Sequence, residues 1–266
     1  MRQYRQKTVV ITGACGRIGR ALAARFGEAG SRIVLIDIRK DELAALVEYL
    51  QTKTFQAEGF YCDVSDNIQV EKVFSRIINT FATIDVLVNG ASLIHNARFE
   101  QTELTAIERM MRVNFYGALY CTRAALPKLC ANQGQIISMT NISGFPPLWY
   151  LSAYTASKQA LHGLLDSLRL ELAESNVTIT LVCPGFMATD KRKHALQADG
   201  SVVINNGEIS AKATSPNEIA GEIFESARRD KPLVLISNVD RLTRLIAQLV
   251  PSFFQRHIAH RVEGIE

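Results

Sequence analysis

The sequence predicts an α/β protein with one doubly wound parallel sheet of about seven strands flanked by helices, and three observations support this. Apolar segments rich in Val and Ile alternate along the chain with segments of helical periodicity. The apolar segments show little polar alternation, which indicates that helices cover both faces of the sheet. Repeated strand–helix–strand units imply right-handed crossovers, and such crossovers join parallel strands.

Seven segments are expected to be strands of this Rossmann-like sheet: residues 8–12, 32–37, 55–63, 84–89, 134–139, 177–183 and 232–237. Between them, "RIGRALAARFGEAG", closed by Gly30, and "KDELAALVEYLQT" have helical spacing. We expect residues 1–238 to form one catalytic domain and residues 239–266 an amphipathic helical tail. Residues 185–215 are the least regular part, and so long a connection inside a domain is usually functional or mobile.

Composition and charge exclude some classes of partner. The chain has 266 residues, 47% of them hydrophobic, and a formal net charge of +4. Lys and Arg are scattered along the chain, so we expect no nucleic-acid partner. We find no signal-peptide pattern and no apolar run of eighteen residues, and therefore expect a cytoplasmic protein. The five dispersed cysteines lack metal-ligand spacing and fit free thiols; they are Cys15, Cys62, Cys121, Cys130 and Cys183.

The stretch "TGACGRIGR" (12–20) has the context of a dinucleotide-binding loop, because it follows the first predicted strand and begins the first predicted helix. Gly13 allows the sharp turn, Gly16 lets the backbone approach a pyrophosphate, and Gly19 lets the helix pack on the strand. The helix N-terminus adds free N–H groups and a positive dipole end, and Arg17 adds a cation.

Asp37 ends the second predicted strand and bears on the choice of cofactor. A carboxylate at this position accepts hydrogen bonds from the adenosine ribose hydroxyls and repels a 2′-phosphate. We therefore expect NAD, with NADP less favoured. Arg39 and Lys40 follow closely, and either could soften this preference by pairing with a phosphate.

"SAYTASKQA" places Tyr154 and Lys158 four positions apart at the start of a helical pattern, so that their side chains share one helix face. An ammonium beside a phenol favours the phenolate and lowers the pKa of the phenol from about 10 toward neutrality. Such a tyrosine can deliver a proton to a carbonyl oxygen or remove one from an alcohol.

With the loop and this pair together, the chain resembles the short-chain dehydrogenase/reductase family over nearly its full length. Several positions match the family in order and spacing. They are Thr12-Gly13 and Gly19, Asp63-Val64, "VNGAS" (88–92) where the family usually has Asn-Asn-Ala-Gly, Asn114 in "RVNFYGAL", Tyr154 and Lys158, and Pro184-Gly185 with Thr189.

The resemblance implies a cofactor role for several of these residues. Asp63 and Val64 would hold the adenine edge, and Ile18 would pack under the cofactor. Asn89 and Ala91 would line the cofactor through backbone and side chain. The residues that would embrace the nicotinamide ring are Pro184, Gly185 and Thr189.

The resemblance also implies the catalytic roles and the assembly. Lys158 would hold the nicotinamide ribose and tune Tyr154, the acid/base. Asn114 would fix a water in a proton relay from Lys158 to solvent. Relatives of this kind are dimers or tetramers, so a homodimer or homotetramer is implied.

Two departures from the family pattern leave the expected cofactor site intact. The spacing of Gly13, Gly16 and Gly19 resembles the loop of extended family members, with Arg17 at the usual middle glycine. Only the backbone N–H of Arg17 must face the phosphate, so an outward side chain is tolerable. Gly90 replaces the second asparagine and removes a side-chain hydrogen bond, a change we expect to be structural.

A third departure concerns the family's catalytic serine, because Asn141 stands at its position. The Asn141 amide can donate a hydrogen bond to a substrate oxygen, although it cannot readily pass on a proton. Thr140 and Ser143 flank it, and Ser143 could fill the role if the loop is reshaped. The expected catalytic set is therefore Tyr154, Lys158, Asn114 and Asn141.

The tail and the aromatic stretch "FPPLWYL" (145–151) suggest an apolar substrate. From Leu242 onward apolar residues recur at helical spacing with arginines between them, interrupted by Pro251. This pattern fits a helix on the sheet edge, a subunit interface, a membrane-surface contact or a lid over a lipid-like substrate. Phe145, Trp149 and Tyr150 beside the expected site favour a hydrophobic alcohol or ketone.

Two alternative functions remain open. The loop spacing allows an enzyme that acts on a nucleotide sugar, and the missing serine allows a catalytically weak NAD-binding or regulatory protein. No metal is expected, since His95 has no partner cluster and is interpreted as a polar residue on the pocket rim.

Overall fold

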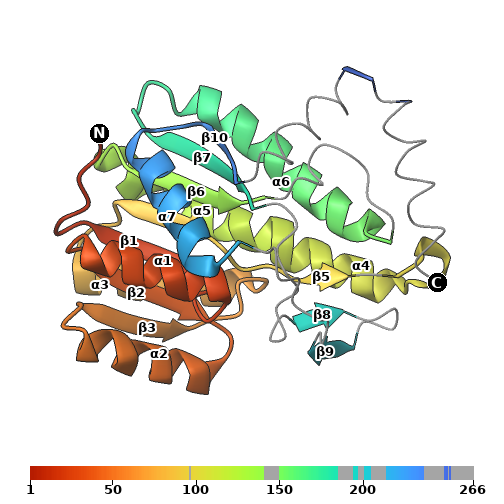
Figure 1. Ribbon diagram of the computed structural model, residues 1–266, viewed down its shortest axis with the longest axis horizontal. Coiled ribbons are helices and arrows are strands. Elements are labelled where there is room, and N and C mark those ends of the chain that lie inside the picture. The colour runs from red at the N-terminus through yellow and green to blue at the C-terminus, as the bar shows by residue number, and fades with distance from the viewer. Residues whose placement is uncertain are drawn as a thin grey trace.

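Seven parallel strands form the main sheet of the protein, in the order β10-β7-β6-β4-β1-β2-β3 (Figure 1). The computed structural model describes residues 1–95, 97–140, 150–184, 194–196, 201–204, 214–236, 249–250 and 252. The strands are β1 (Thr8–Thr12), β2 (Arg32–Asp37), β3 (Ala57–Tyr61), β4 (Val86–Asn89), β6 (Gln135–Met139), β7 (Thr178–Cys183) and β10 (Leu233–Leu235). All seven predicted strands and the predicted doubly wound sheet are thus confirmed.

Helices connect these strands and lie on both faces of the sheet (Figure 1). They are α1 (Arg17–Glu28), α2 (Lys40–Thr52), α3 (Asn67–Phe81), α4 (Leu104–Met111), the π-helical turn η2 (Arg112–Gly117), α5 (Ala118–Ala131), α6 (Ser152–Glu171) and α7 (Pro216–Arg228), with the short 3₁₀ turn η1 (Phe99–Gln101). The predicted helices after the first and second strands are confirmed as α1 and α2, and Gly30 (φ +77°) follows the end of α1.

The two sheet faces bury separate apolar cores, because successive strand residues point to opposite sides. In β1, Val9 and Ile11 pack with α1, α2 and α7. Val10, between them, packs with α3, α5 and α6 on the other face. Strands covered on both faces need apolar residues at nearly every position, which explains the unbroken Val and Ile runs.

The strand order reverses direction at β1, whose neighbours are β2 and β4. In open sheets of this kind ligands bind beyond the carboxyl ends of the strands at this reversal point. The residues after β1 and β4 therefore mark the expected cofactor site, and the residues after β6 and β7 lie farther along the same edge.

A second, three-stranded sheet was not predicted from the sequence. Its strands are β5 (Ile94–His95), β8 (His194–Leu196) and β9 (Val202–Ile204), in the order β5-β8-β9. β5 pairs parallel with β8, and β8 pairs antiparallel with β9. Two of these strands lie within residues 185–215, which the sequence pattern left irregular because three-residue strands are too short to show a period.

Candidate active site

The glycine-rich loop after β1 is shaped by close backbone contacts. Gly13 has φ +64°, a conformation that favours glycine, and a Cβ placed on it would lie 2.7 Å from the Cα of Ala91. A Cβ on Gly19 would lie 2.5 Å from the carbonyl oxygen of Gly13. Glycine at these two predicted loop positions is therefore a steric requirement of this backbone.

The N-terminus of α1 is suited to bind an anion. Gly16 is the N-cap of the helix, and no side chain caps its first N–H groups. Uncapped N–H groups and the helix dipole together favour a phosphate. Arg17 begins the helix with a half-buried side chain, and Ile18 packs against the core beneath it. The uncapped helix start and the tight Gly13 turn fit a pyrophosphate.

The predicted ribose-binding carboxylate, Asp37, is already fully engaged. Its Oδ1 accepts hydrogen bonds from the backbone N and the Nε of Arg39, each at 3.0 Å. Its Oδ2 accepts from the backbone N of Cys15 at 2.9 Å and from Nη2 of Arg39 at 3.3 Å. Four bonds occupy the approximately four acceptor sites of a carboxylate.

The electrostatics of this pair follow from its burial and its bonds. Asp37 is only 5% exposed. Burial alone would raise the pKa of Asp37, but the hydrogen bonds and charge of Arg39 outweigh it and hold that pKa below its usual value. The carboxylate in turn raises the pKa of Arg39 against the effect of burial. Arg39 also lies near Glu42, which Arg20 contacts as well.

The residues expected near the adenine follow β3. Asp63 is half-buried, and its Oδ1 accepts hydrogen bonds from the backbone N and the hydroxyl of Ser65. Val64 is buried and belongs to the apolar core on the α5 face, where it lies against Gly117. Asp63 is thus an ordered part of the turn after β3, and the Val64 side chain packs between this turn and η2.

The residues after β4 are fastened to the end of β1. The hydroxyl of Thr12 accepts hydrogen bonds from the backbone N of Gly90 at 3.1 Å and of Ala91 at 3.3 Å. The Asn89 side chain turns into the protein, where its Nδ2 donates to the hydroxyls of Thr122 and Ser138. Asn89 therefore links β4, β6 and α5, while the Ala91 backbone stays beside the glycine loop.

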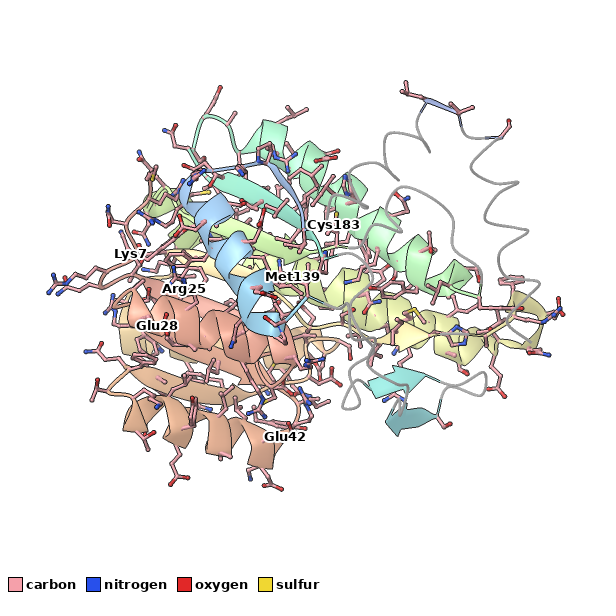
Figure 2. All side chains as sticks on the ribbon, viewed as in Figure 1. Lys7, Arg25, Glu28, Glu42, Met139 and Cys183 are labelled. Carbon is pink, nitrogen blue, oxygen red and sulfur yellow. The ribbon has the colours of Figure 1, made fainter. Side chains whose placement is uncertain are left out.

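Tyr154 and Lys158 lie in the first two turns of α6, and both are buried, at 4% and 2% exposed. The Nζ atom of Lys158 lies 5.8 Å from the centre of the Tyr154 ring. Nζ also donates a hydrogen bond of 2.9 Å to the carbonyl oxygen of Met139. Met139, labelled in Figure 2, is the last residue of β6. The predicted pair is thus brought together at the carboxyl edge of the sheet.

Asn114 lies within η2, where the chain winds as a wider π-helical turn. Such turns are rare and often occur at functional sites. Its Oδ1 accepts from the backbone N of Leu93 at 2.8 Å, and its Nδ2 donates to the carbonyl oxygen of Leu93 and the hydroxyl of Ser157, each at 3.0 Å. Asn114 therefore joins the segment after β4 to α6.

The region of the expected serine is described only up to Thr140. The Thr140 hydroxyl donates to the carbonyl oxygen of Val182 at 3.1 Å and contacts the sulfur of Cys183 at 3.2 Å. These bonds join the end of β6 to β7, where Met139 and Cys183 lie (Figure 2), and they engage the Thr140 hydroxyl with β7.

The other predicted residues of this region are only partly described. Pro184 is half-buried and follows β7 directly. The predicted residues that lie outside the described part of the chain are Asn141, Ser143, Phe145, Trp149, Gly185 and Thr189. Of the predicted tail, Leu249, Val250 and Ser252 are described, and all three are exposed.

His95 is not a rim residue but a buried one. It is 1% exposed, its Nε2 lies 3.4 Å from the hydroxyl of Thr102, and burial lowers its pKa. Its Nδ1 has no hydrogen-bond partner within the described part of the chain. The expectation of a rim position failed because His95 belongs to a two-residue strand, β5, that pairs with β8 in a sheet the sequence did not predict.

Three polar residues of this region were missed by the sequence analysis. Ser157 could have been found, because it lies three positions after Tyr154 and so shares its helix face. Thr122 and Ser138 leave no sequence signal, since their partner Asn89 comes from a distant strand. The described residues contain no group of three metal-binding side chains and no helix long and apolar enough to cross a bilayer.

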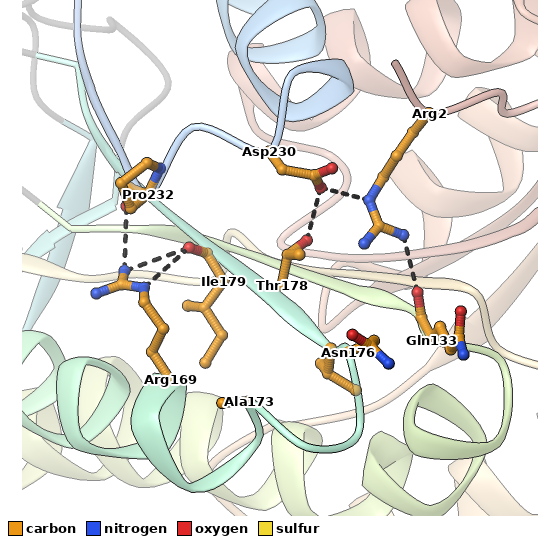
Figure 3. A pocket seen from close by; sticks show the side chains of 10 residues that line it. Arg2, Gln133, Arg169, Ala173, Asn176, Thr178, Ile179, Asp230 and Pro232 are labelled. Atoms are coloured by element: carbon orange, nitrogen blue, oxygen red, sulfur yellow. Dashed lines mark hydrogen bonds and ion pairs between the residues drawn. The ribbon is translucent and has the colours of Figure 1, made fainter.

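An open cavity of about 730 Å³ lies away from these residues, at the amino-terminal ends of β6 and β7 (Figure 3). Its charged groups bind one another or the backbone. Arg2 pairs with Asp230 and donates to the carbonyl oxygen of Gln133, while Asp230 also accepts from the hydroxyl of Thr178. Arg169 donates to the carbonyl oxygens of Ile179 and Pro232. This cavity is lined by a structural network that joins the N-terminus to the start of β10.

Comparison with known proteins gives consistent matches. A family model described as short chain dehydrogenase matches residues 7–200. The chain is 30% identical over 263 residues to dehydrogenase/reductase SDR family member 7B of Mus musculus, covering 97% of this chain and 81% of the mouse protein. It is 32% identical over 271 residues to dehydrogenase/reductase SDR family protein 7-like of Anopheles gambiae, covering 99% of this chain and 86% of that protein.

Solved structures agree with these matches. A metagenomic short-chain oxidoreductase in complex with NADP is 26% identical, with a TM-score of 0.73 over 88% of this chain and 98% of that one. A short-chain dehydrogenase/reductase from Burkholderia phymatum in complex with NAD is 21% identical, with a TM-score of 0.80. That match covers 94% of this chain and 96% of the other chain. The second shows likeness of fold, and the two crystals hold different nicotinamide cofactors.

Proposed function

The chain belongs to the short-chain dehydrogenase/reductase family, an oxidoreductase family, and from that membership we propose that it transfers hydride between a nicotinamide cofactor and a secondary alcohol or ketone. One observation carries the proposal. Tyr154, Lys158 and Asn114 belong to one buried group at the sheet edge that also holds the glycine loop. An acid/base group beside a dinucleotide loop is what carbonyl reduction requires.

The chain's own residues then have distinct tasks. Gly13 and the start of α1 would bind the pyrophosphate of the nucleotide, whose nicotinamide would supply or accept the hydride. Tyr154 gives a proton to the carbonyl oxygen, or takes one from the alcohol, and the buried Lys158 ammonium favours the phenolate. Asn141 donates a hydrogen bond to the same oxygen.

The residues around Tyr154 favour a hydrophobic substrate. Tyr154 packs with Met110 and Ala153 in a small apolar cluster, against which further apolar side chains lie. These are Leu93, Ile94, Ile107 and Leu151. A mostly apolar wall with few polar groups is typical of sites for apolar ligands. We therefore propose an apolar ketone or alcohol as the substrate. We also propose that the tail is a lid or a membrane contact and that the assembly is a homo-oligomer.

The first prediction concerns turnover. The purified chain should oxidise NADH or NADPH, measured by absorbance at 340 nm, in the presence of a member of a panel of hydrophobic ketones. Tyr154→Phe should lower kcat by roughly 10²–10⁴-fold, because it removes the acid/base group. Its affinity for NADH, measured by fluorescence titration, should not change. Tyr49→Phe, at an exposed tyrosine of α2, is the control, and full activity in Tyr154→Phe would contradict the proposal.

The second prediction concerns the choice of cofactor. We propose that the chain prefers NAD weakly, since Arg39 neutralises the carboxylate that would repel a 2′-phosphate. Asp37→Ala should shift the ratio of the Kd values toward NADP by about 10-fold, because it removes the negative charge that repels a 2′-phosphate and leaves the Arg39 guanidinium free to pair with one. Arg39→Ala should shift it toward NAD. The control is Asp41→Asn, an exposed acid on α2; unchanged ratios in both variants would defeat the assignment.

A catalytically silent nicotinamide-binding protein is the second candidate. It is favoured by Asn141 at the serine position and by the Thr140 hydroxyl, which is committed to Val182. If Asn141→Ser creates turnover where the native chain has none, while both bind NADH equally, this candidate is supported. A nucleotide-sugar substrate rests on the glycine spacing alone, and the same assay with nucleotide sugars would reveal it.

A further inference from the structure

Ser157 stands between the predicted relay residue and the predicted acid/base residue. Its side chain is 0% exposed. The hydroxyl donates a hydrogen bond of 2.7 Å to the carbonyl oxygen of Tyr154 and accepts one of 3.0 Å from Nδ2 of Asn114. The bond to the preceding helical turn is ordinary for a serine inside a helix. The bond from a buried amide of another element is not part of that local pattern.

The Asn114 amide has little freedom left once Ser157 is in place. Both hydrogens of Nδ2 are used, one on the carbonyl oxygen of Leu93 and one on Ser157. Oδ1 accepts from the backbone N of Leu93, which leaves one acceptor site on the amide. A water bound by the side chain of Asn114 must therefore donate to Oδ1. Leu93 fixes the orientation of the Asn114 amide, and Ser157 takes the remaining N–H and so leaves only Oδ1 to face any proton relay.

We propose that Ser157 is a positioning residue that ties the Asn114 amide to the helix carrying Tyr154. This inference rests on the proposed function, because positioning is meaningful only if Tyr154 exchanges protons. The bonds run from Leu93, beside the loop after β4, through Asn114 to Ser157 and the backbone of Tyr154. They join the wall of the cofactor site to α6, and so hold the phenol at a fixed place relative to that wall.

Ser157→Ala tests the proposal because it should lower kcat and leave KM unchanged. A misplaced acid/base group slows chemistry without weakening ground-state binding. We expect kcat to fall by about 10–100-fold, the order of loss that follows a small misplacement of a catalytic group. The KM values for ketone and nucleotide should not change. A variant with unchanged kcat, or with a raised KM alone, would overturn the proposal.

The partner of Ser157 is tested by a double-mutant cycle. If Ser157 acts through Asn114, then Ser157→Ala combined with Asn114→Ala should be no slower than Asn114→Ala alone. Losses that multiply would show that the two residues act separately.

Ser31→Ala is a matched control, because Ser31 is also buried and its hydroxyl donates to the carbonyl oxygen of Tyr4 at 2.9 Å, far from α6. It should keep its kcat, while near-UV circular dichroism and Tm verify the fold of every variant. A similar loss of kcat in Ser31→Ala would attribute the effect to general destabilisation and overturn the assignment.

A measurement without turnover separates failure of this inference from failure of the proposed function. The side-chain amide protons of Asn114, assigned by their loss in Asn114→Ala, should exchange slowly with solvent in the native chain and quickly in Ser157→Ala. Unchanged exchange would overturn the inference even if the enzyme is active. Faster exchange in a chain that reduces no ketone would support the contact and reject the proposed function.

Discussion

Gly90 shows how one residue can depart from a family pattern for a steric reason. A Cβ placed on Gly90 would lie 2.6 Å from the carbonyl oxygen of Thr12, closer than a carbon side chain can approach backbone. The same residue donates its N–H to the hydroxyl of Thr12. Gly90 was expected to be structural because it removes a side-chain bond, and the structure gives a further reason: the end of β4 lies against the end of β1 here.

This contact gives the third prediction. Gly90→Ala should lower the free energy of unfolding by about 1–3 kcal/mol, because the added methyl overpacks a buried contact. Urea unfolding measures the change. Nucleotide affinity should fall as well, since the shifted loop includes Ala91, which Gly13 touches.

Gly163→Ala is the matched control, because Gly163 lies within α6 and a Cβ there meets nothing within 4 Å. This variant should gain roughly 0.5–1 kcal/mol, as alanine replaces glycine in a helix. Equal effects at the two glycines would contradict the steric argument.

At the scale of elements, the small β5-β8-β9 sheet contains a buried histidine that should make its stability depend on pH. His95 on β5 is buried, and its pKa lies below the ordinary value because burial disfavours the charged imidazolium. The unfolded chain binds this proton more readily than the folded chain does. The contribution of His95 to stability is therefore complete above the unfolded pKa of about 6.5 and declines as pH falls through that value toward the folded pKa.

The fourth prediction follows from this loss of stability at low pH. When the pH is lowered from 7.5 to 5.5, the protection factors at residues 94–95, which correct for the slower intrinsic exchange in acid, should fall more than those in β1, because β5 must open to admit the proton. His95→Gln, which carries no titratable group, should lose most of this pH dependence. If native chain and variant respond to acid alike, His95 does not control the stability of this sheet.

At the scale of the whole molecule, the sequence was sufficient for the sheet and its layers but not for every contact of the site. The seven strands could be predicted because runs such as "TVVIT" and "RIVLID" are apolar at nearly every position, which only a sheet covered on both faces requires. The Tyr154 and Lys158 pair could be predicted because helical spacing is a local property.

The contacts that escaped prediction depend on side-chain rotamers or join residues far apart in the sequence. The ribose contact expected of Asp37 stays a prediction, and what the sequence did not show is that Arg39 and the backbone of Cys15 bond to its oxygens. Which side chains bond to one another across two turns depends on their rotamers, and rotamers leave no periodic pattern in the sequence. His95 was misplaced for a related reason, since its burial depends on pairing with a strand about a hundred positions later.

The bond between Arg2 and Asp230 has a consequence for how the chain matures during synthesis. Along one edge the strands are added in the order in which they are translated, β4, β6, β7 and then β10, so that half of the sheet can grow as the polypeptide emerges. Arg2 is made almost at once, yet its partner follows 228 positions later. At about 5–20 residues per second, ribosomes need on the order of 10–45 seconds to cover that interval. Arg2 can bind the Gln133 carbonyl earlier, but its bond to Asp230 must wait through nearly all of translation, and its closure onto the segment before β10 is among the last events of folding.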